Sequence, residues 1–562
     1  MNAAPQWAPA PVAVPRPAAT VMVLRDGPEG MEVLLLRRAQ RANDRSSGAY
    51  VFPGGTLDTG DRALHEYCRG LDDGAASRRL GLPEGGLDYY VAAIRECFEE
   101  AGLLFVCGAD GSAAPLPPLA PEQWQYVRAA LRRGELGFAE FCARHGLWLA
   151  ADQLAYHSHW ITPRGLPKRF DTRFFVAIVP AGQEVSIDGE ETVEHRWIRP
   201  HDALSGALAG RLPNATRHTL QALSRFRTAR ECVAHAQALR EIAVIEPRIA
   251  VGPEGPQPVM PDHPAYAEIG RIDPDGRGSA SCELVPGRAV RLSGRIVRVT
   301  APNGNLMTGP GTNSYFVGDP HGDSWALIDP GPDDAAHLAA LVAAAPGPVR
   351  WILVTHTHKD HSPLAAALKA RTGAVLLGMR PQHDEWQDAR FAPDRALAHG
   401  ERLRLGAQTT LRVIHTPGHA SNHLCYLLEE EKTLFTGDHV MQGSTVVINP
   451  PDGDMAAYLA SLRALLAEDL DWLAPGHGFL IPQPHAAIER LIAHRLAREA
   501  RVLQALARHG CAGVEELLAE VYAETPPALL PVARRSLTAH LIKLANEGRA
   551  LAQGPRWCAA AR

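Results

Sequence analysis

The string VRWILVTHTHKDHSP, residues 349–363, constrains this chain more than any other feature. An apolar run with strand character passes directly into three histidines and an aspartate. Further along, three more apolar runs end in a histidine or an aspartate, which completes the set His356, His358, Asp360, His361, His419, Asp438 and His477. Imidazole nitrogens and carboxylate oxygens are preferred ligands of zinc. If the runs are strands of one sheet, their ends meet at one edge and predict a two-metal hydrolytic site.

These strings resemble the metallo-β-lactamase superfamily, whose fold is an αββα sandwich. The resemblance implies two ligand sets joined by one aspartate: His356, His358 and His419 for one zinc ion, Asp360, His361 and His477 for the other, and Asp438 as the bridge. It makes Asp360 and Asp438 candidate catalytic residues as well. It also implies a mainly structural role for Asp329 in ALIDPG. Iron and manganese accept the same ligand types, so the sequence leaves the identity of the metal open.

The strings GPGTNSYFVG and TGDHVMQGSTVVI are similar to the β-lactamase-like protein 2 branch, which contains single-stranded-RNA endoribonucleases. That resemblance implies a winged-helix tail. From residue 494 onward the chain has ten Lys and Arg against six Asp and Glu. Arg534, Arg535 and Lys543 follow one another on an expected helix without acidic residues between them, a pattern that favours phosphate contacts. Single-stranded RNA as a partner is what the resemblance implies. The alternative is that this helix packs against the hydrolase body or against a second copy in a homodimer.

A second group of candidate ligands lies in YVAAIRECFEEAGLL, residues 90–104. Glu96, Glu99 and Glu100 stand at positions i, i+3 and i+4, so they share one face of the expected helix. Three carboxylates on one face repel each other unless a cation lies between them, and hard ions such as Mg²⁺ or Mn²⁺ prefer oxygen ligands. Arg95 precedes Glu99 by four residues and can hold it in place.

Together with the Pro-Gly-Gly string at 53–55, this helix resembles the Nudix box, in the long-insertion branch that includes coenzyme A diphosphatase. The resemblance implies hydrolysis of a nucleoside diphosphate linked to another group, with a coenzyme A-like small molecule favoured. Arg95 and the three glutamates are then catalytic, and Gly54 and Gly55 contact the substrate. There is one departure: Gly55 stands 40 residues before Arg95 because a long insertion separates them. The usual glutamate midway through the box therefore has no assignable match.

Composition places these motifs in a multidomain globular chain of the α/β and α+β classes. The chain has 562 residues, 46% of them hydrophobic, and 57 basic against 62 acidic side chains, which excludes a wholly basic nucleic-acid coat. The expected parts are a disordered arm (1–17), a Nudix α/β/α sandwich (18–230), a Pro/Gly-rich linker (231–288), the metallo-β-lactamase fold (289–490) and the winged helix (491–562).

Cysteines and hydropathy indicate the compartment. Nine cysteines without any C-x-x-C argue against a disulfide framework and favour a reducing compartment, the cytoplasm. No run approaches 18 uninterrupted apolar residues, so no membrane partner is expected.

Three functions remain open from the sequence. The first is a bifunctional metal-dependent hydrolase with a Nudix site and a two-zinc site. The second is an RNA-processing or RNA-binding protein with endoribonuclease activity and a degenerate Nudix domain. The third is thioester hydrolysis at the zinc site, as in glyoxalase II-like relatives. The intact ligand sets argue against a pure interaction protein.

Overall fold

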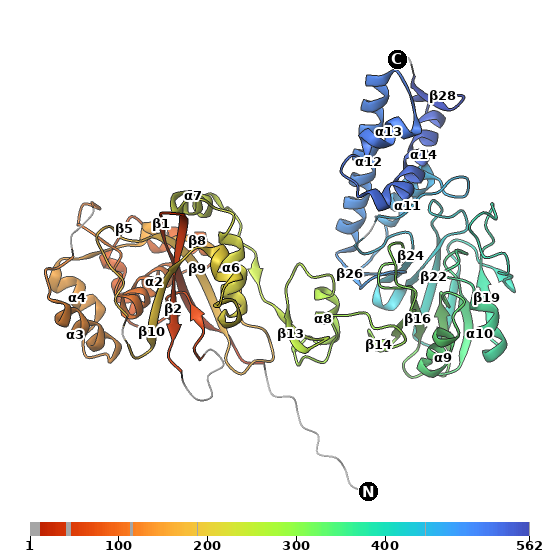
Figure 1. Cartoon of the computed structure of the whole chain (residues 1–562). Coiled ribbons are helices and arrows are strands. Elements are labelled where there is room, and N and C mark those ends of the chain that lie inside the picture. The colour runs from red at the N-terminus through yellow and green to blue at the C-terminus, as the bar shows by residue number, and fades with distance from the viewer. Residues whose placement is uncertain (1–11, 41–46, 113–115, 188, 444, 561–562) are drawn as a thin grey trace, which may run out of the picture. The chain divides into compact units, whose positions relative to one another are not determined.

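The computed structural model in Figure 1 divides into two compact units, Met1–Ile249 with Asp275–Arg277, and Ala250–Pro274 with Gly278–Arg562. It describes residues 12–40, 47–112, 116–187, 189–443 and 445–560. Most of the expected arm, residues 1–11, lies outside these ranges. Its end does not match the prediction, because Arg16 and Pro17 open strand β1 and pair with β9.

The first unit is an α/β/α sandwich around a mixed eight-stranded sheet with the path β10-β2-β1-β9-β8-β11, to which β3 and β4 add at the side. Its strands are β1 (Arg16–Gly27), β2 (Gly30–Arg38), β3 (Tyr50–Val51), β4 (Gly54–Thr56), β8 (Ala155–Ile161), β9 (Phe170–Ile178), β10 (Thr192–Ile198) and β11 (Val244–Ile245). Val21 and Val23 of β1 share a core with the helix α2, and the alternate residues Met22 and Leu24 are equally buried. Both faces of the sheet are therefore covered.

The helices of this unit are α1 (Asp73–Leu80), α2 (Gly86–Ala101), α3 (Pro121–Arg132), α4 (Phe138–His145), α5 (Pro200–Ser205), α6 (Asn214–Leu223) and α7 (Ala229–Ala238). A small sheet adds β5 (Cys68–Arg69), β6 (Val106–Cys107) and β7 (Trp148–Ala150). The insertion after Gly55 is folded: Asp72 caps α1 by accepting from Ala75 N at 2.7 Å, and Gly81 ends it with φ +67°.

The segment 231–288 is not a linker. Helix α7 and β11 belong to the first unit, and β12 (Arg248–Gly252), β13 (Gly255–Val259) and α8 (Tyr266–Ile272) follow. Ile269 of α8 packs in a core with Phe479, and Glu268 accepts two hydrogen bonds from Arg298 at 2.7 and 2.8 Å. The Pro and Gly residues serve the turns of a compact hairpin, so the composition resembled that of a loose connector.

The second unit is an αββα sandwich of two sheets. The first sheet holds β14 (Ala289–Arg291), β15 (Ile296–Thr300), β16 (Asn313–Gly318), β17 (Trp325–Ile328), β18 (Val349–Leu353), β19 (Val375–Gly378) and β20 (Arg395–Ala396). The second holds β21 (Arg402–Gly406), β22 (Thr409–His415), β23 (Leu424–Leu428), β24 (Thr433–Gly437), β25 (Trp472–Pro475) and β26 (Ile481–Pro482). The two sheets share one hydrophobic core, to which the first contributes Val317 and the second Leu411.

Helices cover the outer faces of the sandwich. They are α9 (Ala335–Ala344) and α10 (Ala365–Thr372) on the first sheet, and α11 (Met455–Leu465) and α12 (Pro484–His509) on the second. Because α12 has 26 residues, it continues past the sandwich into a small C-terminal domain.

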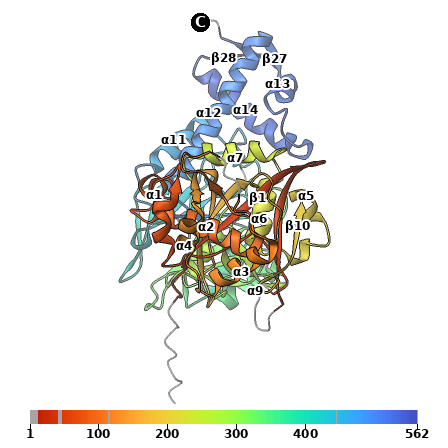
Figure 2. The ribbon, with the colours of Figure 1, turned by 90° about the vertical axis from the view of Figure 1, so that its left-hand side faces the viewer.

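That domain is a winged helix, in which α12, α13 (Val514–Val521) and α14 (Leu530–Asn546) pack with β27 (Cys511–Gly513), β28 (Ala550–Gln553) and β29 (Arg556–Ala559) (Figure 2). Strands β27 and β29 place Cys511 opposite Cys558, and a disulfide joins the two. The argument against disulfides is therefore wrong for this pair, because strand pairing brings together cysteines 47 residues apart. Among the described residues, no helix combines the length and apolar character needed to cross a bilayer.

Candidate active sites

The histidines and aspartates of the second unit lie at the ends of strands from both sheets. The loop after β18 carries His356, His358, Asp360 and His361, and the other three residues follow β22, β24 and β25. The buried strands fix the start of each loop, so residues up to 121 positions apart meet at one edge of the sandwich.

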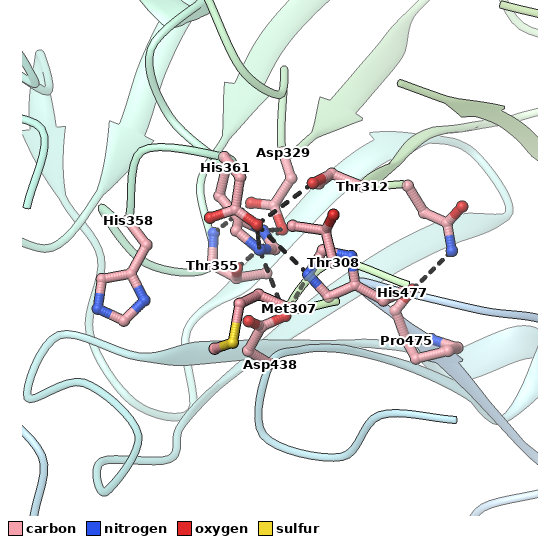
Figure 3. Close-up of polar contacts among 12 residues, drawn as sticks. Met307, Thr308, Thr312, Asp329, Thr355, His358, His361, Asp438, Pro475 and His477 are labelled. Carbon is pink, nitrogen blue, oxygen red and sulfur yellow. Dashed lines mark hydrogen bonds and ion pairs between the residues drawn. The ribbon is translucent and has the colours of Figure 1, made fainter. Parts of the chain in front are cut away.

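The seven side chains form two groups, and the candidate ligand atoms of each group lie within 4.8 Å of one another: His356, His358 and His419 in one, and Asp360, His361, Asp438 and His477 in the other. Asp438 lies beside His361 and His477 of the second group (Figure 3) and also approaches His419 of the first. Its Oδ1 lies 3.3 Å from His361 Nε2 and 3.2 Å from His477 Nε2, while its Oδ2 lies 3.7 Å from His419 Nε2. One oxygen toward each group is the geometry expected of a bridging ligand.

Unsatisfied buried atoms show that this cluster fits metal ions. His361 Nε2 and Asp438 Oδ1 are buried and accept or donate no hydrogen bond within the described part of the chain. Such atoms are costly unless something else pairs with them. The other ring nitrogen of His361 is held at 2.8 Å by Asp329, which also accepts hydrogen bonds from the backbone and hydroxyl of Thr355. Asp329 thereby directs Nε2 of His361 into the cluster.

The protonation states also suit metal binding. Burial, together with a smaller effect of the neighbouring His419, lowers the pKa of His358 to about 3, so the imidazole is neutral, the form that binds metals. For Asp438, burial alone would raise the pKa, but His477 and His361 hold it well below its usual range. An ionised carboxylate therefore lies among neutral and cationic rings.

Two further histidines lie beside the cluster and were not singled out in the sequence. The ring of His423 lies 5.1 Å from that of His356, and the ring of His439 lies 5.5 Å from that of His423. Both are fully buried. In the sequence, His423 directly follows HTPGHASN and His439 directly follows TGD, so both stand close to predicted ligands. The ligand pattern was complete without them, and they were therefore overlooked.

In the first unit, Glu96, Glu99 and Glu100 lie on α2 as predicted from their spacing, and Arg95 contacts two of them. Its Nη1 lies 2.9 Å from Glu96 Oε1 and 3.6 Å from Glu99 Oε1. Glu100 is buried and accepts a hydrogen bond from Gly54 N at 3.0 Å. Burial raises the pKa of Glu99 to about 7, against the opposing effect of Arg95, so the face needs a cation to hold its full negative charge.

Gly54 and Gly55 are close to this face. A Cβ on Gly55 would lie 2.4 Å from Glu96 Oε1, and one on Gly54 would lie 2.4 Å from the carbonyl of Ala19. Gly54 therefore requires glycine, because backbone atoms approach it closely and its φ is +157°, whereas a side chain at Gly55 would displace the Glu96 carboxylate. Whether they also contact substrate stays a prediction.

The carboxylate missing from the middle of the box has a structural counterpart, Asp61. Arg95 donates from Nε to Asp61 Oδ1 at 2.8 Å and from Nη2 to Oδ2 at 3.2 Å, and Asp61 is 1% exposed. The statement that no residue takes this place is therefore wrong. The signal was available, because Asp61 stands six residues after Gly55 and before the insertion. Asp61 is overlooked when the box spacing is counted backward from Arg95, because that count ends inside the insertion.

Three family models match the chain in this order: the NUDT19 Nudix domain over residues 71–211, the metallo-β-lactamase superfamily over 307–477 and the β-lactamase-associated winged helix domain over 514–557. The β-lactamase-like protein 2 homolog of Drosophila melanogaster is 31% identical over 287 residues, which cover 47% of this chain and 92% of the relative. The chain belongs to the metallo-β-lactamase superfamily. In this member the superfamily domain is fused to a Nudix domain and a winged helix.

Other relatives of this metallo-β-lactamase domain carry different names. An atrochrysone carboxyl ACP thioesterase of Aspergillus chevalieri is 34% identical over 252 residues, covering 42% of this chain and 76% of that protein. For the Nudix half, the crystal structure of a NUDIX hydrolase from Alicyclobacillus acidocaldarius covers 39% of this chain and 96% of its own, at 28% identity and a TM-score of 0.34.

Proposed function

We propose that the chain is a bifunctional hydrolase, in which the metallo-β-lactamase half cleaves acyl thioesters and the Nudix half cleaves the diphosphate of a coenzyme A-like molecule. The observation that carries the first activity is the pair of ligand groups that meet at Asp438. Bound metal ions, zinc in first place, would lower the pKa of a water molecule and polarise the thioester carbonyl.

The residues around the cluster have distinct tasks in this proposal. Asp438 fixes the separation of the two groups because its oxygens face different sets of imidazoles. Asp360 has the most exposed side chain of its group, 26%, and accepts a hydrogen bond from Thr312 Oγ1 at 3.3 Å. Its position at the open side suits a carboxylate that accepts a proton from the attacking water.

The charges of α14 favour a thioester over RNA. Arg534 is paired with Glu515 at 2.6 Å, and Lys543 is buried and paired with Glu499 at 2.8 Å. No acidic residue lies between these two cations along α14, but acidic partners come from α13 and α12. Arg535 lies with its guanidinium 4.8 Å from the ring centroid of Trp386. The helix does not present a row of unpaired cations to a phosphate backbone.

Apolar side chains near the metal cluster suit an acyl group. Leu306 and Met307 are 63% and 43% exposed in the loop that ends at Thr312, whose hydroxyl contacts Asp360; Figure 3 draws Met307 together with the cluster. Trp386 is 52% exposed and precedes Gln387, whose backbone bridges to that of His358. Large exposed apolar groups beside a polar centre are typical of a binding surface.

For the Nudix half, the glutamate face with its Arg95–Asp61 pair supports diphosphate hydrolysis with Mg²⁺ or Mn²⁺. The two reactions then form a sequence, because thioester hydrolysis of an acyl-coenzyme A releases the free coenzyme that a coenzyme A diphosphatase would consume.

The test is a substrate panel on the full chain, with acyl-coenzyme A, coenzyme A and single-stranded RNA, each supplied with Zn²⁺ or Mg²⁺. We expect release of free thiol with Zn²⁺ and cleavage of coenzyme A with Mg²⁺. RNA cleavage without thioester cleavage would contradict the first assignment. Mg²⁺-dependent cleavage of other nucleoside diphosphates, with coenzyme A untouched, would contradict the second.

A further inference from the structure

The loop between β24 and α11 reaches the metal cluster through its main chain. Val446 and Val447 lie in this loop outside any strand, and Val446 is buried. Their carbonyl groups therefore need hydrogen-bond donors from elsewhere. Two side chains supply them: Arg495 of α12 donates to Val446 O, and His419 donates to Val447 O at 2.6 Å.

The second of these hydrogen bonds fixes the protonation of His419. A carbonyl oxygen only accepts, so Nδ1 of His419 must carry the proton. The lone pair is then on Nε2, which lies 3.0 Å from His358 Nδ1 and faces the cluster. Loss of the contact with Val447 would free the ring to rotate or to change its tautomer, and either change removes a metal ligand.

Arg495 is held on two sides. It is 2% exposed, its guanidinium lies 5.5 Å from the ring centroid of Tyr458, and one Nη donates to Val446 O. Tyr458 in turn donates through its hydroxyl to His439 O at 2.8 Å. The arginine is thus fixed before it contacts the loop, and it can hold the loop in place.

We propose that Arg495 is a positioning residue for the metal ligand His419 and acts through the backbone of Val446 and Val447. Because Arg495 lies on the helix that enters the winged helix, the C-terminal domain contributes to the metal centre without contacting a metal. The proposal concerns metal binding and does not depend on which substrate is cleaved.

The chain offers a matched control on the same helix. Arg498 also donates to a main-chain carbonyl, that of Val521, and its guanidinium lies 4.2 Å from the ring centroid of Tyr522. Arg498→Met therefore breaks the same kinds of contact as Arg495→Met, and in addition an ion pair with Glu524 at 3.0 Å, but in the winged helix and not beside His419.

The experiment measures metal affinity in the full-length variants by competition with a chelator of known affinity, followed by mass spectrometry of the metal content. For Arg495→Met we expect one of the two transition metals to bind about 10- to 100-fold more weakly, the range for loss of an indirect ligand contact. For Arg498→Met we expect wild-type affinity for both metals. Thermal unfolding in parallel shows that both variants fold.

Two outcomes would overturn the proposal: unchanged affinity in Arg495→Met, or equal losses in Arg495→Met and Arg498→Met. If Arg495→Met does not fold, Arg495→Lys takes its place. Lysine keeps the charge and length but lacks the planar group that fits between Tyr458 and the carbonyl. Weaker binding of one metal is again expected, and wild-type affinity for both would refute the role of Arg495.

Discussion

The two candidate sites of this chain are built in opposite ways. The Nudix site takes its three glutamates from one stretch of α2, so helical periodicity alone brings them together. The metal cluster takes seven side chains from four loops of two sheets, and only the folded sandwich brings them together. A local site is visible in a short sequence window, whereas a dispersed site depends on every strand that carries it.

Their chemistry differs as well. The glutamate face offers only oxygen ligands, which suit hard ions such as Mg²⁺. The cluster offers mainly imidazole nitrogens, which suit zinc and related metals. The two activities should therefore respond to different metals and to different substitutions, and the predictions below test that separation.

The largest effect is expected from Asp438→Ala. Asp438 has one carboxylate oxygen toward each ligand group and so holds the two metal positions together. We expect a loss of thioester hydrolysis of roughly a thousand-fold or more, since several kcal/mol of transition-state stabilisation are removed. Metal content should fall at both positions, whereas His419→Ala should mainly empty one. Full two-metal occupancy with unchanged hydrolysis would refute the bridging role, and cleavage by the Nudix half serves as the internal control.

The reciprocal change is Glu99→Gln. It removes one charge from the glutamate face and should lower Mg²⁺-dependent cleavage of coenzyme A by roughly a hundred-fold or more, because less diphosphate charge is neutralised. Thioester hydrolysis should stay at the wild-type rate. Glu84→Gln is the matched control, since Glu84 lies in the insertion with a side chain that is 76% exposed. Equal coenzyme A cleavage by Glu99→Gln and Glu84→Gln would show that the face is not the active site.

The sequence predicted much of both sites because each has a strong local signal. Spacing placed the three glutamates on one helix face, and strand ends marked all seven residues of the cluster. The order of the three domains was likewise predicted. What periodicity cannot show is which distant residue completes a local pattern. Asp61 reaches Arg95 because the inserted segment folds back against α2, where its Leu64 and Ala76 join the same core, so the sequence distance between them does not predict the spatial one.

Composition misled in the segment 231–288. Proline and glycine indicated a loose connector, yet Glu268 of α8 forms a buried pair with Arg298. A charged pair of this kind is invisible to hydropathy, since Glu268 and Arg298 lie 30 residues apart in sequence and each would be expected at the surface. The interpretation of α14 as a basic phosphate-binding helix was misled for the same reason, because the acidic partners of its cations lie on other helices.

Glu268→Gln tests this assignment and compares the stability of the two units. It leaves the Arg298 guanidinium buried without a counter-charge, which costs on the order of 3–5 kcal/mol. In denaturant unfolding, the transition of the metallo-β-lactamase unit should move to lower denaturant while that of the Nudix unit stays in place. Glu254→Gln, at an exposed position in the neighbouring hairpin, should change neither transition. If Glu268→Gln shifts both transitions or neither, α8 does not belong to the second unit alone.

The smallest expected effect is the opposite response of the two units to pH in the chelated, metal-free protein. Burial raises the pKa of Glu99 to about 7, above its ordinary value near 4.5, so the Nudix unit should lose stability as pH rises from about 4.5 to 7. For Glu499, burial opposes the shift, but hydrogen bonds from His540 and Lys543 lower the pKa to about 2. That carboxylate stabilises the winged helix above about pH 4.5, and the contribution is lost as pH falls toward 2.

Because glutamine does not titrate, the stability difference between wild type and Glu499→Gln should be constant above pH 4.5 and shrink below it. The difference between wild type and Glu99→Gln should instead change between pH 4.5 and 7. Thermal unfolding across this pH range measures both, and a Glu499 difference that does not depend on pH below 4.5 would show that its carboxylate is not held by these partners.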